Sequence, residues 1–318
     1  MARKSQRIIA VTGTRGVIGR LLLDRLATRE DPIVAIDIER PTQKARFYPV
    51  DLVEPNTDVE LERVFQKEAC DTVVHLAYLP RPIFDTAYSH ELQAIGTLNM
   101  LHAARSTGVR HVVSVSPATL YGAHGRNPCY ITEHAPIHPN RDYEYLQDRA
   151  EADQSIVAFM SKYKDMTVVL LRYSPMLGTL CDNLYTRMLA SRTTTTLFGY
   201  DPLLQFCYQD DVADAVMRAI DYKGSGVFNI GGSGVMPLST ALYHAEVIGV
   251  PIAHPIAYSL FQALWILRLT DTPSPHLDYL RYSCIVDTQR AASELKFHPR
   301  FTTQGALMEH LAKRRKAA

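Results

Sequence analysis

Several features are scarce in this chain of 318 residues, and each scarcity excludes a class of protein. It has only five cysteines, and none stands in a C-x-x-C pair, so neither a disulfide framework nor a zinc ribbon is indicated. The most apolar stretch, residues 256–269, is interrupted by Gln262 and Arg268 and is too short and too polar to span a bilayer. Lys and Arg number 34 against 33 Asp and Glu, a net charge of +1, which favours neither a nucleic acid nor an anionic membrane as partner. We therefore expect a protein of the reducing cytoplasm.

Metal-ligand patterns are also missing. His124, His134 and His138 share one proline-rich loop, but their intervals match no catalytic metal site and no H-E-x-x-H helix is present. Hydrophobic residues make up 47% of the chain and charged residues 21%, which is typical of a globular protein with ample core. The sequence thus predicts one large domain or two closely joined ones, without a metal.

Short apolar runs alternate with amphipathic segments up to about residue 120. The runs 8–11, 33–38, 72–76 and 112–115 are rich in β-branched residues, as expected of strands buried on both faces. The segments between them carry apolar residues at helical spacing. This alternation predicts an α/β fold, a Rossmann-like doubly wound parallel sheet.

The rhythm loosens beyond residue 120. We expect a helix at 145–163, a strand at 168–172, an irregular segment at 174–204, a helix at 210–220, a returning strand at 227–231 and a terminal helix near 303–314. These elements divide the chain in two. A dinucleotide-binding domain spans 1–173, with 205–232 returning to the sheet, and a smaller, mainly C-terminal substrate-binding lobe comprises 174–204 and 233–318.

A glycine-rich turn follows the first predicted strand. Gly13 permits a tight turn, Gly16 lets the backbone approach a pyrophosphate, and Gly19 allows close packing of the helix on the strand. The helix N-terminus adds N–H donors and the positive end of its dipole. The predicted cofactor contacts in this turn are Gly13, Thr14, Arg15, Gly16, Val17, Ile18 and Gly19.

The end of the second strand bears on the choice of cofactor. Asp37 lies 24 residues after Gly13, where a carboxylate accepts hydrogen bonds from the adenosine ribose and repels a 2′-phosphate. Asp37 thus favours NAD over NADP, and Ile38 beside it is a further predicted cofactor contact. Arg15 and Arg40 argue the other way, because an arginine could hold a 2′-phosphate, and Asp37 could also be only a strand-end cap.

Short motifs in a fixed order carry a resemblance to a known family. They are Val50-Asp51-Leu52, His75-Leu76-Ala77, Gly96-Thr97-Leu98-Asn99, residues 118–122, 171–173, 211–214 and 228–232. With the glycine turn, they resemble the extended short-chain dehydrogenases/reductases of the NAD-dependent epimerase/dehydratase group. The resemblance implies that Asp51, Leu52, Leu76 and Ala77 also contact the cofactor.

The resemblance further implies a catalytic tyrosine, a lysine four residues later that lowers its pKa and holds the nicotinamide ribose, and a Ser or Thr that orients the substrate oxygen. Tyr145 matches the tyrosine, but Arg149 stands at the lysine position and Pro117 at the Ser/Thr position. Ser116 and Thr119 could substitute, although adjacent strand positions point to opposite faces. Tyr145, Arg149, Ser116 and Asn99 are the candidate catalytic residues, and Tyr145 and Arg149 also contact the cofactor.

The predicted substrate lobe departs from sugar-nucleotide enzymes of this group. They carry an Asn where this chain has Pro175 and an Arg where it has Leu204, and Arg281 could replace that Arg only in part. A less charged small-molecule substrate is therefore indicated.

Two functions stay open. One is an NAD-dependent oxidoreductase or epimerase/dehydratase that uses Tyr145 as acid/base. The other is a catalytically impaired regulatory or scaffold protein with a protein partner, given Pro117 and Arg149. The segments 92–101 and 156–160 resemble the helices that form the family's dimer interface, so we expect a homodimer.

Overall fold

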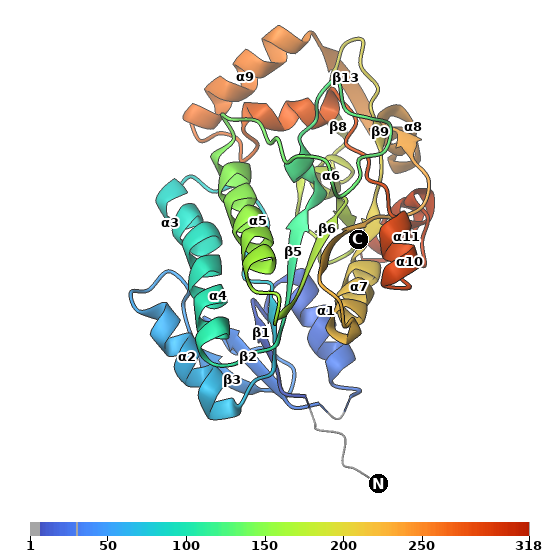
Figure 1. The fold of residues 1–318 in the computed structure, drawn as a ribbon. Coiled ribbons are helices and arrows are strands. Elements are labelled where there is room, and N and C mark those ends of the chain that lie inside the picture. Colours follow the sequence, from blue (N-terminus) through green and yellow to red (C-terminus); the bar gives the residue numbers. More distant parts are fainter. Residues whose placement is uncertain (1–6, 30, 318) are drawn as a thin grey trace.

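The computed structural model describes residues 7–29 and 31–317. A single parallel sheet of seven strands runs through its centre in the order β11-β6-β5-β4-β1-β2-β3 (Figure 1). The strands are β1 (Ile9–Thr12), β2 (Ile33–Asp37), β3 (Arg46–Pro49), β4 (Thr72–His75), β5 (His111–Pro117), β6 (Thr167–Tyr173) and β11 (Gly226–Ile230). This order confirms the predicted α/β, Rossmann-like doubly wound sheet. Strand order reverses beside β1, and in such sheets ligands bind at the carboxyl ends of the strands next to that reversal.

Helices cover both faces of the sheet. One face packs against α2 (Thr57–Glu68), α4 (Gly96–Ser106) and α5 (Glu144–Lys162), and the other against α1 (Val17–Leu26) and α7 (Gln209–Asp221). Helix α1 buries Ile18, Leu22, Leu23 and Leu26, the apolar stripe that its sequence spacing predicts. Because both faces are covered, β1 and β4 are buried along their whole length.

Short irregular helices connect these layers. Helix α3 (Thr86–His90) continues through one π-helical turn, Glu91–Ile95, into α4. Two 3₁₀ helices follow, η2 (Ala118–Tyr121) at the end of β5 and η3 (Ser274–Leu280) beneath α9 (His254–Ile266). Both 3₁₀ helices contribute side chains to the cavities described below.

The remaining elements form a smaller lobe with an apolar core of its own, drawn from residues between 177 and 311. The segment 174–204, expected to be irregular, contributes strands to two-stranded pairs, because partners distant in the sequence complete them. The pairs are β7 (Met176–Leu177) with β10 (Cys207–Tyr208), β8 (Thr193–Leu197) with β13 (Ile248–Ile252), and β9 (Leu203–Leu204) with β12 (Met236–Pro237). The other helices are α6 (Leu184–Met188), α8 (Leu238–Ala245), α10 (Gln289–Glu294) and α11 (Thr303–Ala317).

All five cysteines lie in the described part and are free. Within residues 7–29 and 31–317, no helix is long and apolar enough to cross a membrane.

Candidate active site

The glycine turn between β1 and α1 is built so tightly that two of its glycines are required by the fold itself. Gly13 has a φ of +69°, and a Cβ there would lie 2.5 Å from the backbone of Leu76 and Ala77. A Cβ at Gly19 would lie 2.3 Å from the Gly13 carbonyl oxygen. Gly16 differs: its φ is −62°, and a Cβ would meet only the Gly13 oxygen at 3.4 Å. The fold therefore does not need a glycine at position 16, whereas a close-lying pyrophosphate would.

Asp37 is tied to this turn. Its carboxylate accepts hydrogen bonds from the backbone N–H groups of Arg15 (2.9 Å) and Ile38 (2.8 Å) and from the Thr14 hydroxyl (3.3 Å). Arg15 forms an ion pair with Glu39. Two carboxylates, those of Asp37 and Glu39, therefore lie near one guanidinium, that of Arg15. The excess negative charge would repel a 2′-phosphate.

The other residues expected at the adenosine end lie at neighbouring strand ends. Ile38 is 59% exposed, and Leu52 is buried. The Asp51 carboxylate accepts a hydrogen bond from the Val53 N–H (3.2 Å). Asp37, Ile38, Asp51 and Leu52 do not line the cleft described next.

A cleft extends from the turn across the carboxyl ends of the strands and encloses about 930 Å³, including its open mouth. Pockets of this size hold small molecules and cofactors. Of the residues expected at the cofactor, it is lined by Arg15, Gly16, Val17, Ile18, Gly19, Leu76, Tyr145 and Arg149. We call it the dinucleotide cleft.

Arg149 lies at the inner wall of the dinucleotide cleft and is only 2% exposed. Its guanidinium carbon sits 3.5 Å from the centre of the Tyr78 ring, and Nη2 donates to the Val115 carbonyl (3.0 Å). Nη1 is buried and has no hydrogen-bond partner among the described residues. An orphaned charged donor in a cleft is costly, and a hydroxyl of a bound ligand would relieve that cost.

A neutral polar network lies behind the Tyr78 ring. The Tyr78 hydroxyl is 2.9 Å from the Ser114 hydroxyl. His75 is fully buried between the hydroxyls of Thr12 (2.8 Å) and Thr97 (3.1 Å). Burial, and to a lesser extent the nearby Arg149 cation, lower the pKa of His75 to about 3. His75 is therefore neutral at pH 7, so the polar network behind the Tyr78 ring adds no charge near Arg149.

Tyr145 lies in the first turn of α5, and its hydroxyl donates to the Leu79 carbonyl oxygen (2.9 Å). Burial raises its pKa above the ordinary value, and the Arg149 cation opposes that rise. Tyr145 consequently holds its proton at neutral pH in this arrangement. Arg149 is the charge placed to favour its ionised form.

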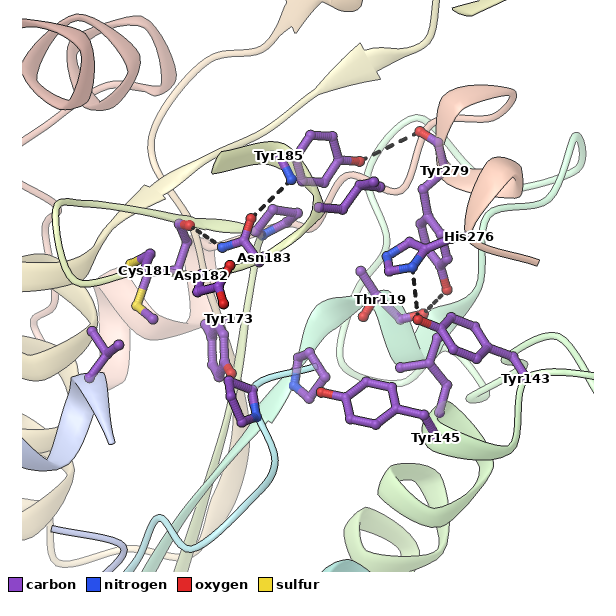
Figure 2. A pocket seen from close by; sticks show the side chains of 17 residues that line it. Thr119, Tyr143, Tyr145, Tyr173, Cys181, Asp182, Asn183, Tyr185, His276 and Tyr279 are labelled. Atoms are coloured by element: carbon purple, nitrogen blue, oxygen red, sulfur yellow. Dashed lines mark hydrogen bonds between the residues drawn. The ribbon is translucent and has the colours of Figure 1, made fainter. Parts of the chain in front are cut away.

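A second cavity of about 800 Å³ opens beside the cleft (Figure 2). The two spaces adjoin, because six residues line both: Tyr145, Val17, Pro80, Tyr173, Met176 and Asp182. The second cavity's polar wall is mostly aromatic: Tyr143, Tyr145, Tyr173, Tyr185, His276 and Tyr279. We call it the aromatic cavity.

The structure does not bring Ser116 or Asn99 to Tyr145. Val115 lines the dinucleotide cleft, and Pro117 and Thr119 line the aromatic cavity, whereas Ser116 lines neither. The alternation of side chains along a strand explains this, since Ser116 points away from the face that carries its neighbours. Asn99, on α4, also lines neither cavity. Thr119 is the hydroxyl residue of this segment that lines the aromatic cavity together with Tyr145.

Other polar side chains in the aromatic cavity are committed to other contacts or held neutral. Asp182 accepts hydrogen bonds from Arg187 at 2.5 and 2.8 Å. Burial raises the pKa of the Cys181 thiol to about 12, so it is not a thiolate at neutral pH. Neither group is a strong candidate for proton transfer.

A third cavity of about 960 Å³ contains Arg281. Its guanidinium donates to the Tyr200 hydroxyl (2.9 Å) and lies 4.9 Å from the ring centres of both Tyr200 and Tyr282. A narrow space of about 290 Å³ shares lining residues with the aromatic cavity and the Arg281 cavity. Pro175 and Leu204 line this space, and no Lys or Arg is among its lining residues, so a diphosphate there would find no cation.

Sequence reasoning missed three contributors to the site. Tyr78, Tyr143 and His276 carry no motif, and His276 lies 131 residues after Tyr145. Only the packing of η3 against the start of α5 reveals that His276 and Tyr143 meet, at 2.9 Å. For Tyr78 the one available signal was its position directly after His75-Leu76-Ala77.

Comparisons with known proteins agree with this geometry. An uncharacterized protein of Mycobacterium tuberculosis (strain ATCC 25618 / H37Rv) is 28% identical over 96% of this chain and 83% of its own length. The UDP-glucose 4-epimerase of Mycolicibacterium smegmatis is 26% identical over 95% of this chain and 96% of its own length.

Solved structures resemble the fold over nearly the whole chain. MoeE5 in complex with UDP-glucuronic acid and NAD has a TM-score of 0.77 at 20% identity, covering 98% of this chain and 100% of that one. The UDP-glucose 4-epimerase of Thermus thermophilus, in complex with NAD, has a TM-score of 0.74 at 20% identity, covering 98% of this chain and 99% of that one. At these identities the likeness shows the fold.

The sequence profile described as the NAD dependent epimerase/dehydratase family matches residues 9–231, more than half of the chain. The predicted resemblance is thereby confirmed, and NAD in the similar structures supports the predicted cofactor. The chain belongs to the NAD-dependent epimerase/dehydratase family.

Proposed function

We propose that this protein binds NAD in the dinucleotide cleft and oxidises or reduces a hydroxyl or carbonyl compound held in the aromatic cavity. The observation that carries the proposal is the junction of the two spaces at Tyr145. A hydride acceptor in one space and an alcohol in the other would meet there. Of the two phenols that line both spaces, Tyr145 and Tyr173, Tyr145 shares helix α5 with Arg149.

The residues of the cleft fit NAD. Gly16 leaves room for a pyrophosphate, α1 begins there without an acidic residue in its first turn, and Asp37 with Glu39 suits an unphosphorylated ribose. The buried, unpartnered Nη1 of Arg149 would donate to a hydroxyl of the nicotinamide ribose. When bound, NAD supplies the site for hydride transfer.

Tyr145 would move the proton. When a ketone is reduced, the Tyr145 hydroxyl exchanges its bond to the Leu79 carbonyl for one to the substrate oxygen and gives its proton to that oxygen, leaving a phenolate, while bound NADH would supply the hydride. When an alcohol is oxidised, the same phenolate takes the alcohol's proton. Arg149 favours that phenolate electrostatically, as the family's lysine would, but a guanidinium does not act as a proton relay. Thr119 supplies the hydroxyl that Pro117 lacks.

The walls of the aromatic cavity indicate the substrate class. It has no Lys or Arg among its lining residues, so a diphosphate would lie there without a counter-charge. Tyrosine rings bind planar or aliphatic bodies, and their hydroxyls bind neutral polar groups. We infer a small neutral alcohol or ketone, because the narrow space between the aromatic cavity and Arg281 also offers a nucleotide sugar no cation.

Calorimetry followed by turnover assays tests the proposal. Apo-protein should bind NAD more tightly than NADP. NADH formation should then be measured with a panel of secondary alcohols, with UDP-glucose and UDP-glucuronic acid included. Tyr145→Phe should abolish turnover while NAD binding stays measurable by calorimetry. Absence of heat with all four nicotinamide nucleotides would refute the proposal.

A second candidate function rests on the altered catalytic positions. Pro117 offers no hydroxyl, and the Tyr145 hydroxyl is already engaged as a hydrogen-bond donor to the Leu79 carbonyl. A chain that binds NAD but turns over nothing would then act as a nucleotide-dependent regulatory or scaffold protein with a protein partner. NAD binding without turnover on any substrate of the panel would favour this function.

Assembly and location complete the proposal. We infer a homodimer formed through the outer faces of α4 and α5, and a reducing cytoplasm, which five free cysteines support. Sedimentation at micromolar concentration should give twice the mass of 35.7 kDa.

A further inference from the structure

Two side chains that no motif singles out face the aromatic cavity as a bonded pair. Tyr143, just before α5, and His276, in η3, both line that cavity. The Tyr143 hydroxyl is 2.9 Å from Nδ1 of His276, and the ring centres are 5.3 Å apart. Figure 2 shows the pair on the same wall as Tyr145.

The protonation of the pair follows from its surroundings. Burial, and less so the neighbouring Tyr145, raise the pKa of Tyr143 well above its ordinary value, so it keeps its proton. Burial lowers the pKa of His276 to about 4, with Asp271 opposing. At pH 7 the pair is therefore a neutral phenol and a neutral imidazole.

One tautomer of the imidazole follows from the hydrogen bond. Among the described residues, the Tyr143 hydroxyl has Nδ1 of His276 as its one hydrogen-bond partner, so it donates there. Nδ1 then accepts, and the remaining ring proton must sit on Nε2. Nε2 has no hydrogen-bond partner among the described residues, and it is not a buried orphan. It is thus an accessible N–H donor in a cavity otherwise lined mainly by tyrosine and apolar side chains.

We propose that His276 binds a second oxygen of the substrate through Nε2–H, and that Tyr143 is the positioning residue that fixes this tautomer. This inference rests on the proposed function and narrows its substrate class. The substrate is a neutral compound that carries, besides the alcohol or ketone facing Tyr145, a further oxygen able to accept a hydrogen bond. A neutral imidazole is suited to this role, because it donates without placing a charge in an apolar cavity.

The tautomer is tested by ¹⁵N NMR on histidine-labelled full-length protein at pH 7. We expect His276 to show a protonated Nε2 and an unprotonated Nδ1. Tyr143→Phe should shift the His276 signals toward a mixture of tautomers, and His298→Gln, at an exposed histidine, should leave them unchanged. A protonated Nδ1 or a doubly protonated ring in the wild type would overturn the proposal.

The donor role is tested on the same samples with NAD present. 2-Hydroxycyclohexanone, which carries two oxygens, should shift the Nε2 resonance, and cyclohexanol should shift it less. His276→Phe should abolish the preference for the first probe over the second in binding, and His276→Gln, which keeps an N–H donor, should restore part of it. Equal responses to the two probes, or no response to either, would count against the proposal.

NAD affinity, measured by calorimetry, separates this inference from the proposed function. His276 does not line the dinucleotide cleft, so its variants should bind NAD as the wild type does. Loss of NAD binding in the wild type would defeat the proposed function, whereas intact NAD binding with the wrong tautomer would defeat only the role of His276.

Discussion

Arg149→Lys restores the residue that the family carries, and the structure predicts that it weakens the fold. The guanidinium stacks on the Tyr78 ring at 3.5 Å and donates to the Val115 carbonyl, while only 2% exposed. A desolvated cation–π contact contributes roughly 2 kcal/mol, and a hydrogen bond from a charged donor about 1.5–3 kcal/mol. An ammonium can neither lie flat on the ring nor keep the same reach.

Since lysine recovers part of these contacts, we expect Arg149→Lys to lower the free energy of unfolding by about 2–4 kcal/mol. Urea denaturation of the apo-protein, followed by circular dichroism, measures the loss. Arg105→Lys is the matched control, because Arg105 also lies over a tyrosine ring, that of Tyr163 at 4.7 Å, but at the surface. The control should change stability by less than about 0.5 kcal/mol.

The reasoning would be refuted if Arg149→Lys unfolded at the same urea concentration as the wild type. That result would mean that the Tyr78 stack and the Val115 hydrogen bond contribute nothing net. Tyr78 and Arg149 would then not act as one unit in place of the family's lysine.

Three further predictions concern the turn, the core and pH. Gly16→Ala should fold normally but weaken NAD binding in calorimetry by roughly tenfold to a hundredfold, the loss of one or two contacts to a pyrophosphate; Gly305→Ala, far from the cleft, should not. In the wild type, the buried Arg172 guanidinium donates to the Asp153 carboxylate at 2.6 and 3.0 Å. Asp153→Ala removes this carboxylate and should lower the free energy of unfolding in denaturant by about 3–5 kcal/mol; a loss below about 1 kcal/mol would contradict this. His75, with its pKa lowered to about 3, takes up a proton more readily when unfolded, so stability should fall as pH drops from about 6.5 toward 3. His75→Gln should make that decline, followed by thermal melts, less steep.

The family and the core of the fold could be predicted from the sequence because both rest on local signals. β-branched runs, helical stripes and the turn from Gly13 to Gly19 act over a few residues, and the fold could not close without Gly13 and Gly19. Tyr145 and Arg149 share one helix, so their spacing alone placed them together. Pro117 already showed in the sequence that the Ser/Thr position has no hydroxyl.

The rest of the site depended on contacts between segments distant in the sequence. Tyr78 follows β4, and Arg149 of α5 donates to Val115 of the neighbouring strand β5, so the two side chains meet. His276 of η3 meets Tyr143 at the start of α5. Side-chain direction decided between Ser116 and Thr119, since strand alternation assigns faces only once the strand's register is known. Sequence spacing therefore determined which residues could form the cleft, and tertiary packing decided which hydroxyls and rings face the substrate.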